Sequence, residues 1–360
     1  FQTVVATRAG VTVTEVYIVH LNKEYVREGS IVQEHMISVS DVTDRVLEIL
    51  PKIEKQMNEA LELLQADEID RSSCTCLLLS KGHHCNSFEY FNPDLPDPSI
   101  YNLPSLWGKR LETFVTEGRL KLSNIELDEV TNQQKPVLAA FKNGGQFIDE
   151  ADIQNFFDTL EYPLYFLDYE AYGSAIPMID GLSPHDHLPF QFSLHIMQAD
   201  GSVSHVEYLA EELELPEKLV DALMQNIGES GSVIAWHKTY ENERNKHLAK
   251  LYPNHEEFLL GLVDRTQDVD DVFKTGYVDL AFGGSTSIKK VLPVIVPDLT
   301  YEGMDIAEGT AAMDAWAKMV AEEDGEAKAK LRKDLLAYCE LDTLAMVRIF
   351  EYVKSVLSSA

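Results

Sequence analysis

The sequence lacks any long apolar run. None of its 360 residues belongs to an uninterrupted apolar stretch of the roughly 18 residues or more that a membrane-spanning helix needs. It also lacks a positively charged leader followed by an apolar segment and a cleavage site. These absences argue against membrane insertion and secretion, so we expect a cytoplasmic protein with no membrane partner.

Basic residues are scarce, with 30 Lys and Arg against 60 Asp and Glu, for a net charge of −30. A general nucleic-acid-binding protein relies on Lys and Arg to contact phosphates, so the overall charge argues against that class. A metal-dependent nuclease is not excluded, because bound cations reverse the local field of a carboxylate site. Local basic pairs include Lys109-Arg110, Arg119-Lys121 and Lys289-Lys290. Most of the acidic excess is typical of a solvated surface.

Cysteine is also rare, and three of the four cysteines lie in "CTCLLLSKGHHC": Cys74, Cys76 and Cys85. Their C-x-C-x8-C spacing, in a chain expected in the cytoplasm, favours a metal over a disulfide. Zinc with His83 or His84 as a fourth ligand is one possibility, and the absence of a metal is another. We expect the isolated Cys339 to be a packing residue.

The length and a hydrophobic content of 45% predict two domains or more. Residues 11–27 are rich in β-branched and aromatic residues, which predicts a strand running into a turn. A helix should follow, with Asp41 as its cap and Pro51 in its early turns. Its apolar positions repeat every three or four residues: Val46, Ile49, Ile53, Met57, Leu61 and Leu64.

Loop signals dominate the next part of the chain. The stretch "YFNPDLPDPSIYNLP" is rich in Pro and Asn and predicts a loop, and we place a domain boundary between residues 90 and 150. From the helical "IDEADIQNFFDTL" onward, strands and helices alternate. That order is typical of an α/β domain.

Two carboxylates interrupt the apolar stretch "YPLYFLDYEAYGSAIP". The run from Leu164 to Leu167 predicts a central strand, and Asp168 and Glu170, two positions apart, should share one face of it. Two carboxylates on one face repel each other and need a shared cation, a proton or open water. A solvent-exposed position just beyond the strand is the alternative.

Two further acidic positions lie downstream. Glu241 begins a predicted helix just after a predicted strand at 232–236, where an acid can also serve only the helix dipole. In the late helix "LLAYCELDTLAMVRIFEYV", Tyr338 and Asp342 are four residues apart on an apolar stripe. The other members of that stripe are Leu331, Leu335, Ala345 and Ile349. An unpaired carboxylate on such a stripe is costly.

These motifs resemble the three exonuclease motifs of the DEDD superfamily, tyrosine subclass: Asp168-x-Glu170, the acid after "WHKTYE", and Tyr338-x-x-x-Asp342. More closely, "YFLDYEAYGSAIPMIDGLSPHDHLPFQFSLH", "GSTSIKKVLP" and "YCELDTLAMVRIF" resemble a bacterial family called domain of unknown function 2779. The resemblance covers about residues 155–355. It implies an α/β, RNase H-like exonuclease domain, with a central mixed sheet flanked by helices, over residues 151–360.

The resemblance also implies residue roles. Two Mg²⁺ or Mn²⁺ ions would hold the phosphate of a single-stranded 3′ end. Asp168 would bridge both ions, and Glu170 and Asp342 would bind the ion that carries the attacking water. Glu241 would contact the other ion through water, and Tyr338 would orient the attacking water. Further residues are predicted to bind substrate: Phe166, Leu167, Tyr169, Lys289 and Lys290. For the first three of these, core packing is the alternative.

The second motif departs from the superfamily pattern. The superfamily usually has Asp where this chain has the longer Glu241, and His237 stands where Asn is common. The sequence therefore does not decide whether the Glu241 carboxylate reaches the metal directly. Glu243 is a less suitable substitute, because it lies two residues further round the helix.

The N-terminal "FQTVVATRAGVTVTEVYIVHLNKEYVREG" resembles the region after the catalytic strand of RecB-like PD-(D/E)xK nucleases. It implies a truncated nuclease domain over residues 1–90, joined by a connecting region, 91–150, to the exonuclease domain. The catalytic acid and lysine would precede Gln2, so the segment should be inert. The resemblance also implies an iron-sulfur cluster in the complete protein, held by the three clustered cysteines and one cysteine upstream.

Three functions follow as hypotheses. The first is a metal-dependent 3′–5′ exonuclease acting on DNA or RNA. The second is a nucleic-acid-binding module of the same fold that has lost the reaction, for which Glu241 and the acidic charge are the arguments. The third is a scaffold with no nucleic-acid role.

Overall fold

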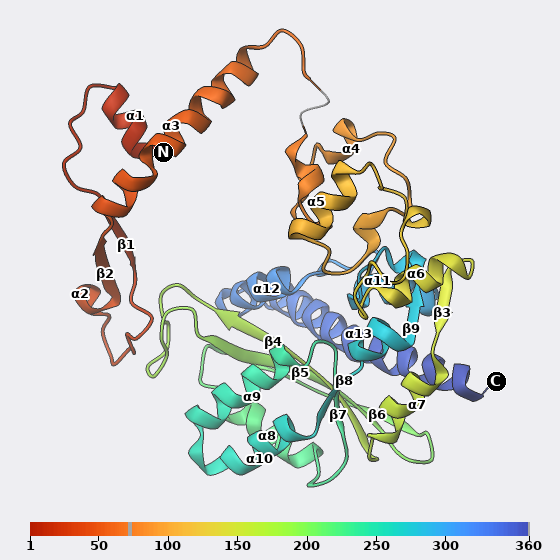
Figure 1. Cartoon of the computed structure of the whole chain (residues 1–360). Coiled ribbons are helices and arrows are strands. Elements are labelled where there is room, and N and C mark those ends of the chain that lie inside the picture. Colours follow the sequence, from red (N-terminus) through yellow and green to blue (C-terminus); the bar gives the residue numbers. More distant parts are fainter. Residues whose placement is uncertain (71–73, 359–360) are drawn as a thin grey trace. The chain divides into compact units, whose positions relative to one another are not determined.

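The computed structural model describes residues 1–70 and 74–358. It forms two compact units, one of Phe1–Cys74 with Gly173–Asp186 and one of Thr75–Tyr172 with His187–Ala360. Figure 1 labels their elements along the chain. The domain boundaries near residues 90 and 150 both fall inside the second unit, and the division inferred from the sequence stays a prediction.

The first unit contains a two-stranded antiparallel sheet in which Tyr17 lies opposite Asp41 and Leu21 opposite Ile37. Its elements are α1 (Gln2–Arg8), β1 (Tyr17–Leu21), α2 (Gln33–Met36), β2 (Ile37–Asp41) and α3 (Thr43–Gln65). The strand predicted over residues 11–27 is therefore present but much shorter. Within this unit, the Arg27 side chain forms an ion pair of 3.1 Å with Asp180, which ties the 173–186 loop to the rest.

Helix α3 confirms the predicted amphipathic helix. The predicted cap is corrected, because the N-cap of α3 is Val42, which has no side-chain capping bond. The carboxylate of Asp41, one residue earlier, accepts a hydrogen bond of 2.9 Å from the backbone N–H of Thr43. Pro51 lies inside the helix. No residue of α3 is buried, and Leu64 is 80% exposed. Of the predicted apolar stripe, Ile49, Leu61 and Leu64 are thus exposed, whereas the other three members are half-buried.

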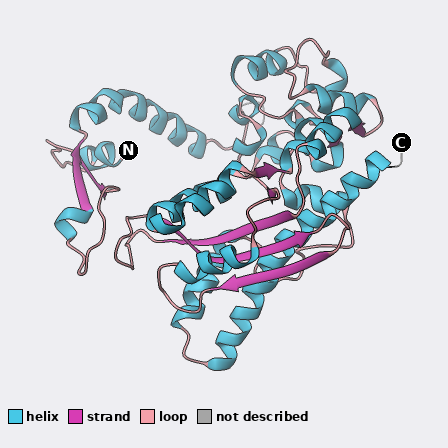
Figure 2. Ribbon diagram, turned by 90° about the horizontal axis from the view of Figure 1, so that it is seen from below, coloured by secondary structure: helices cyan, strands magenta, loops and turns pink. Residues whose placement is uncertain are grey.

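The second unit is built on a mixed five-stranded sheet in the order β6-β5-β4-β7-β8. Its strands are β4 (Leu164–Gly173), β5 (His187–Met197), β6 (Val203–Leu209), β7 (Val233–Ala235) and β8 (Thr266–Asp268). Strand β6 runs antiparallel to β5, whereas β7 is parallel to both β4 and β8. The predicted central strand, which carries Asp168, is the middle strand of this sheet. Figure 2 shows the strands in magenta with the helices in cyan beside them.

Helices cover both faces of this sheet (Figure 1). The helices of the second unit are α4 (Phe88–Phe91), α5 (Gly108–Thr116), α6 (Lys135–Lys142), α7 (Glu150–Asp158), α8 (Glu217–Asn226), α9 (Thr239–Leu251), α10 (Glu256–Asp264), α11 (Ile288–Ile295), α12 (Gly309–Ala321) and α13 (Gly325–Ser358). A short antiparallel pair joins β3 (Gln146–Ile148) to β9 (Tyr277–Asp279). These elements confirm the predicted alternation of strands and helices.

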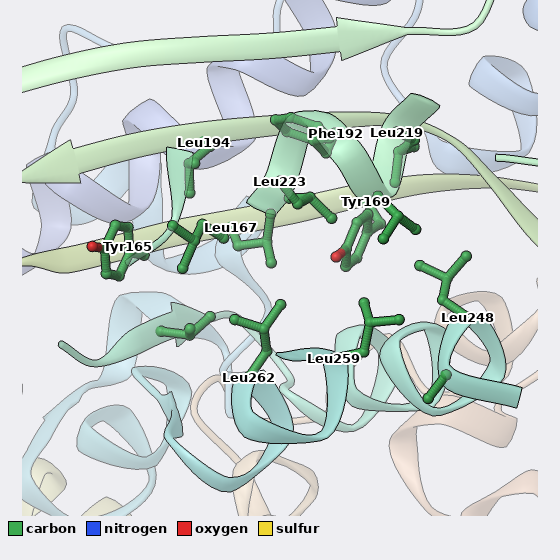
Figure 3. Packing of buried hydrophobic residues seen from close by; sticks show 14 residues of the cluster. Tyr165, Leu167, Tyr169, Phe192, Leu194, Leu219, Leu223, Leu248, Leu259 and Leu262 are labelled. Atoms are coloured by element: carbon green, nitrogen blue, oxygen red, sulfur yellow. The ribbon is translucent and has the colours of Figure 1, made fainter. Parts of the chain in front are cut away.

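Alternation along β4 divides its side chains between two cores. Tyr165 and Leu167 pack with residues of α8, α9 and α10 (Figure 3). Phe166 packs against α13 on the opposite face, with its ring centroid 5.4 Å from that of Phe350. Asp168 and Glu170 have the same parity as Phe166. The alternation therefore turns both carboxylates toward α13.

The predicted loop at 90–104 is only partly irregular. Its last residues form a short 3₁₀ turn at Ile100–Asn102, in which Ile100 is fully buried and Tyr101 nearly so. Burial of these apolar side chains orders a segment whose Pro and Asn content predicts only a loop. Of the helices in the described residues, none combines the length and hydropathy that crossing a bilayer requires.

Candidate metal centre

Three carboxylates from two distant parts of the chain meet at the end of β4. One oxygen each of Asp168, Glu170 and Asp342 lies within 4.8 Å of the other two. Asp342 comes from α13, where Leu335, Ala345 and Ile349 are fully buried and hold the helix against the unit's core. The convergence that the sequence predicts is present. What the group binds stays a prediction.

Burial and mutual repulsion make these carboxylates weak acids. Burial, followed by the charges of Asp342 and Glu170, raises the pKa of Asp168 well above its usual range. Burial and the Asp342 charge raise the pKa of Glu170 to about 8. Burial also raises the pKa of Asp342 to about 6. Such a group must hold protons or a cation at neutral pH.

Neighbouring hydrogen-bond donors and a positive charge limit the rise in the pKa of Asp342. The hydroxyl of Tyr301 donates a hydrogen bond of 2.6 Å to its Oδ1. This bond, the positive charge of Lys289 and the hydroxyl of Tyr338 all lower the pKa of Asp342 and partly offset burial. The Lys289 Nζ lies 5.6 Å from the ring centroid of Tyr301 and 5.8 Å from that of Tyr338. Two phenols and one lysine therefore surround this carboxylate.

The thiol of Cys339 contacts the same group. Its Sγ donates a long hydrogen bond of 3.6 Å to Oδ2 of Asp168. The side chain is fully buried, and burial raises the pKa of the thiol well above its usual range. Cys339 is thus a neutral packing residue, as expected, that also touches the candidate centre.

Glu241 reaches the same cavity from α9 but lies outside the group of three. Its side chain is buried in the first turn of the helix, and burial raises its pKa to about 8. Within the described residues, its Oε2 is buried without a hydrogen-bond partner. Glu243 is exposed and forms an ion pair of 3.0 Å with Lys246. The helix thus turns Glu241 inward and Glu243 outward.

We call the space that these residues enclose the acidic cavity. It has a volume of about 490 Å³. Its lining includes Asp168, Glu170, Glu241, Tyr338, Asp342, His187, His237, Tyr240, Ser287, Lys289, Gly309 and Thr310. Four carboxylates around one open space form an oxygen-rich ligand set of the kind that Mg²⁺ and Mn²⁺ prefer. The unpaired oxygen of Glu241 fits such an ion or its water shell.

The turn before α9 has its own acidic support. His237 adopts a left-handed φ of 64°. The Asp268 carboxylate accepts hydrogen bonds from the backbone N–H groups of His237 and Lys238. A hydrogen bond from the His237 ring to Asp270, at 3.2 Å, raises the pKa of His237. Lys274 also contacts Asp270, at 2.6 Å. Within this second group of His237, Asp268 and Asp270, Lys274 is thus the cation paired with Asp270, and Asp268 holds the turn.

The predicted base-stacking residues are corrected by the structure. Phe166 and Leu167 are fully buried, and their side chains pack in the core. Tyr169 is 2% exposed, although it is among the residues that line the acidic cavity. The Tyr169 hydroxyl is occupied by a hydrogen bond of 2.8 Å to Asn245. Apolar residues next to a catalytic motif are here packing residues, which was the alternative.

The two lysines that were predicted to bind substrate line different cavities. Lys289 lines the acidic cavity, and its Nζ donates a hydrogen bond of 2.6 Å to the carbonyl of Ala307. Lys290 lines a different cavity, together with residues 80–82 and 103–107. Only Lys289 therefore lies at the carboxylates.

The cysteine motif stays a prediction. Cys74 ends the first unit, whereas Cys76 and Cys85 belong to the second. None of the four cysteines, all of which lie in described residues, is part of a disulfide. The ring of His84 stacks on Phe88 at 3.6 Å, and its Nε2 lies 3.0 Å from the carbonyl of Leu79. His83 Nδ1 lies 2.9 Å from the Ser80 hydroxyl.

Tyr301 is a site residue that carries no signal in the sequence. This residue follows α11 in a segment without helix or strand, "PDLTYEGM". Neither periodicity nor a motif marks a loop tyrosine, and only the tertiary structure brings it to Asp342. Nothing in the sequence could have identified it.

Part of the chain is similar to a known protein family. The family described as Domain of unknown function (DUF2779) matches residues 165–287. The match confirms the family resemblance over this segment, which contains Asp168, Glu170 and Glu241 but ends before Asp342. The family's description states no activity.

Three curated relatives from mycoplasmas and a ureaplasma are similar to the chain. Uncharacterized protein MG366 homolog of Mycoplasma pneumoniae is 26% identical over 220 residues, 55% of this chain and 33% of the relative. Uncharacterized protein MG366 of Mycoplasma genitalium is 23% identical over 69% of this chain and 40% of its own length. Uncharacterized protein UU173 of Ureaplasma parvum is 22% identical over 87% and 51%. The matches span about a third to a half of these relatives, and no solved structure matches significantly.

Proposed function

We propose that the second unit is a metal-dependent 3′–5′ exonuclease of the DEDD type, acting on single-stranded DNA or RNA ends in the cytoplasm. The observation that carries the proposal is the convergence of Asp168, Glu170 and Asp342 within 4.8 Å, at the end of the middle strand. Three adjacent carboxylates with raised pKa values, of which Glu170 is buried and the other two are half-buried, are costly unless a cation neutralises them. Phosphodiester hydrolysis is a reaction class that uses such a cation site.

The arrangement of the sheet supports the RNase H-like part of the proposal. The acid-bearing β4 is central, β7 lies parallel to it, and the antiparallel pair of β5 and β6 lies on its other side. The helix that supplies the last acid packs across one face. Order and direction of the strands thus agree with the central mixed sheet that the resemblance implies.

Each residue has a chemical task in this proposal. When bound, two divalent ions would polarise the phosphate and lower the pKa of the attacking water. Asp168, Glu170 and Asp342 would hold these ions, and Glu241 would act through water. The Tyr338 hydroxyl would orient the attacking water. Lys289 sits beside the carboxylates, where its charge can contact a phosphate oxygen.

A digestion experiment tests the function. The full chain is incubated with Mn²⁺ and single strands labelled at either the 5′ or the 3′ end. A 3′–5′ exonuclease releases the 3′ label at once as a mononucleotide and shortens the 5′-labelled strand stepwise. Loss of both patterns in Asp342→Asn assigns them to the centre. No cleavage of either strand by the parent chain would reject the proposal.

A second candidate is a nucleic-acid-binding module of the same fold without the reaction. It is favoured by one observation, that Glu241 is outside the group whose oxygens lie within 4.8 Å. If Glu241 does not serve the second ion, that ion lacks a ligand. Nucleic-acid strands would then bind without being cleaved. Binding of the same labelled strands with no cleavage in Mn²⁺ would support this candidate.

For the first unit we propose a partial RecB-like nuclease segment. Its support comes from the exposed apolar residues of α3 and of the strand β1, where Val19 is 65% exposed. The relatives are longer than the matched region, so they contain further chain that could cover such a surface. The iron-sulfur cluster, with zinc as the alternative, belongs to the same proposal. Anaerobic reconstitution of the present chain should give no stable cluster, and a full cluster would contradict it.

A further inference from the structure

A second cavity of the same unit lies next to the acidic cavity along the chain. We call it the basic groove; it has a volume of about 520 Å³ and its lining includes Lys81, Trp107, Gly284, Ser285 and Lys290. Ser285 lines the basic groove and Ser287 lines the acidic cavity. Two residues span at most roughly 7 Å. One short loop therefore separates the two cavities.

That loop is fixed from two directions. Gly284 has a φ of +80°, and a Cβ at this position would lie 2.3 Å from the carbonyl oxygen of Asn102, so only glycine fits. On the other side, the indole N–H of Trp236 donates a hydrogen bond of 3.1 Å to the carbonyl of Thr286. Lys81 Nζ donates to the carbonyl of Gly283 at 2.8 Å. The wall between the two cavities is thus held by direct contacts.

Adjacent lysines of α11 face the two cavities. Lys289 lines the acidic cavity and Lys290 the basic groove. Neighbouring residues on a helix project about 100° apart, which accounts for the division. A single nucleic-acid strand that contacted both lysines would pass from the basic groove over the loop to the carboxylates of the acidic cavity.

The charge of the groove contrasts with that of the chain. Asp and Glu make up 60 of the 360 residues, yet the described residues that line the groove include two lysines and no acid. The acidic surface repels a polyanion, whereas the lysines of the basic groove attract it. The groove is therefore a local exception to the acidic surface.

A large exposed aromatic completes the groove. Trp107 is 72% exposed, whereas Trp316 is 1% exposed and stacks on Phe190 at 4.6 Å. Ser105, two residues before Trp107, has a left-handed φ of 51°, which is costly for a residue with a side chain. Lysines beside an exposed aromatic ring form the pattern that binds single strands, in which bases stack and cations contact the backbone.

We propose that the basic groove binds the segment of a single-stranded nucleic acid that leads to the acidic cavity. Trp107 stacks on a base, and Lys290 contacts a backbone phosphate. The proposal rests on the proposed exonuclease function and adds the path of the strand beyond its terminal nucleotide. Its test uses binding alone, so it stands or falls separately from cleavage.

Tryptophan emission reports the stacking. The full chain is titrated, without divalent metal, with a ten-nucleotide oligothymidylate. Of the three tryptophans, Trp316 is buried, whereas Trp236 is half-buried against Phe273 and lines the acidic cavity. The quenching that depends on the groove is therefore that of Trp107. Trp107→Ala should weaken binding by about 5- to 150-fold, the range expected for one stacked base. Trp107→Phe, which keeps a ring, should lose the quenching and retain most of the affinity.

Salt dependence reports the phosphate contact. One phosphate contact on a single strand contributes about −0.7 to the slope of log K against log salt. Measured by anisotropy of a labelled oligonucleotide, Lys290→Gln should reduce the magnitude of this slope by about 0.7. The control Lys333→Gln removes the same charge from the exposed side of α13 and should leave the slope unchanged.

Three outcomes would overturn the proposal. The first is parental affinity in both Trp107→Ala and Lys290→Gln. The second is an equal loss of slope in Lys333→Gln. The third is equally good displacement of the oligonucleotide by a polyglutamate peptide of the same charge. Cleavage by the parent chain with normal binding by the groove variants would reject the groove alone. Groove-dependent binding without any cleavage would reject the exonuclease function alone.

Discussion

The hydroxyl of Tyr301 donates a hydrogen bond of 2.6 Å to Oδ1 of Asp342 and so joins a loop to the last helix at the carboxylate group. The bond lowers the pKa of Asp342 against the effect of burial. It also fixes the position of one oxygen of the carboxylate. Tyr301 is therefore expected to position a metal ligand.

Tyr301→Phe removes this bond and keeps the ring. The pKa of Asp342 should rise further above about 6, so the acidic limb of the pH–rate profile should move to higher pH. The profile is measured in Mn²⁺ for parent and variant. An unshifted acidic limb would show that the bond does not control the protonation of Asp342.

Tyr338→Phe separates a water-orienting hydroxyl from a packing ring. Turnover should fall by about 10² to 10⁴, with substrate affinity little changed, because the buried ring still fills its space. Single-turnover kinetics measure the first quantity and strand binding the second. Parental turnover would remove Tyr338 from the proposed reaction.

The apo protein should lose stability as pH rises. Glu170 titrates at about 8 in the folded chain, against an ordinary value of 4.5, so the folded state binds more protons between these values. The free energy of unfolding therefore falls as pH rises from about 4.5 to about 8. Mn²⁺ should offset this loss, and it should stabilise more at about pH 8 than at about pH 5, because its ligands must be deprotonated.

Denaturant unfolding with and without Mn²⁺ measures this effect. Glu243→Gln is a matched control, because Glu243 is exposed and paired with Lys246. It should keep the full response to Mn²⁺, whereas Asp342→Asn should lose most of it. A response to Mn²⁺ that is equal at both pH values would contradict the predicted linkage.

Glu241→Gln tests the departure from the superfamily pattern. If Glu241 acts on an ion through water, the Mn²⁺ concentration needed for half-maximal cleavage should rise by about 10- to 100-fold. Its buried, unpartnered Oε2 is the structural reason for this expectation. An unchanged Mn²⁺ requirement for cleavage would show that Glu241 has no metal role in the reaction.

Phe166 tests the correction to the predicted substrate contacts. Its side chain is fully buried, so Phe166→Ala should cost about 3 to 5 kcal/mol of unfolding free energy. The milder Phe166→Leu should cost less and leave strand affinity unchanged. Weaker strand binding by a stable Phe166→Leu chain would restore the base-stacking role.

The sequence predicts those parts of the site that local patterns control. An apolar run before Asp168 identifies β4, and the stripe of α13 places Tyr338 and Asp342 on its inner face, because burial imposes a periodicity on each element. No such periodicity marks Tyr301, whose loop reaches Asp342 only through tertiary packing. Burial also decided between the two roles of Phe166, since an aromatic beside a motif suits a core and a base equally well. The adjacent Lys289 and Lys290 look equivalent in sequence, and only the helix geometry separates them.

The central claim is that Asp168, Glu170 and Asp342 hold divalent ions, with Glu241 in support. Calorimetric titration of the full chain with Mn²⁺ at about pH 8 tests it most directly, since the ligands are then largely deprotonated. We expect saturable binding of about two ions per chain, lost in Asp168→Asn and retained in Glu243→Gln. Absence of saturable binding, or equal binding by Asp168→Asn, would contradict the account.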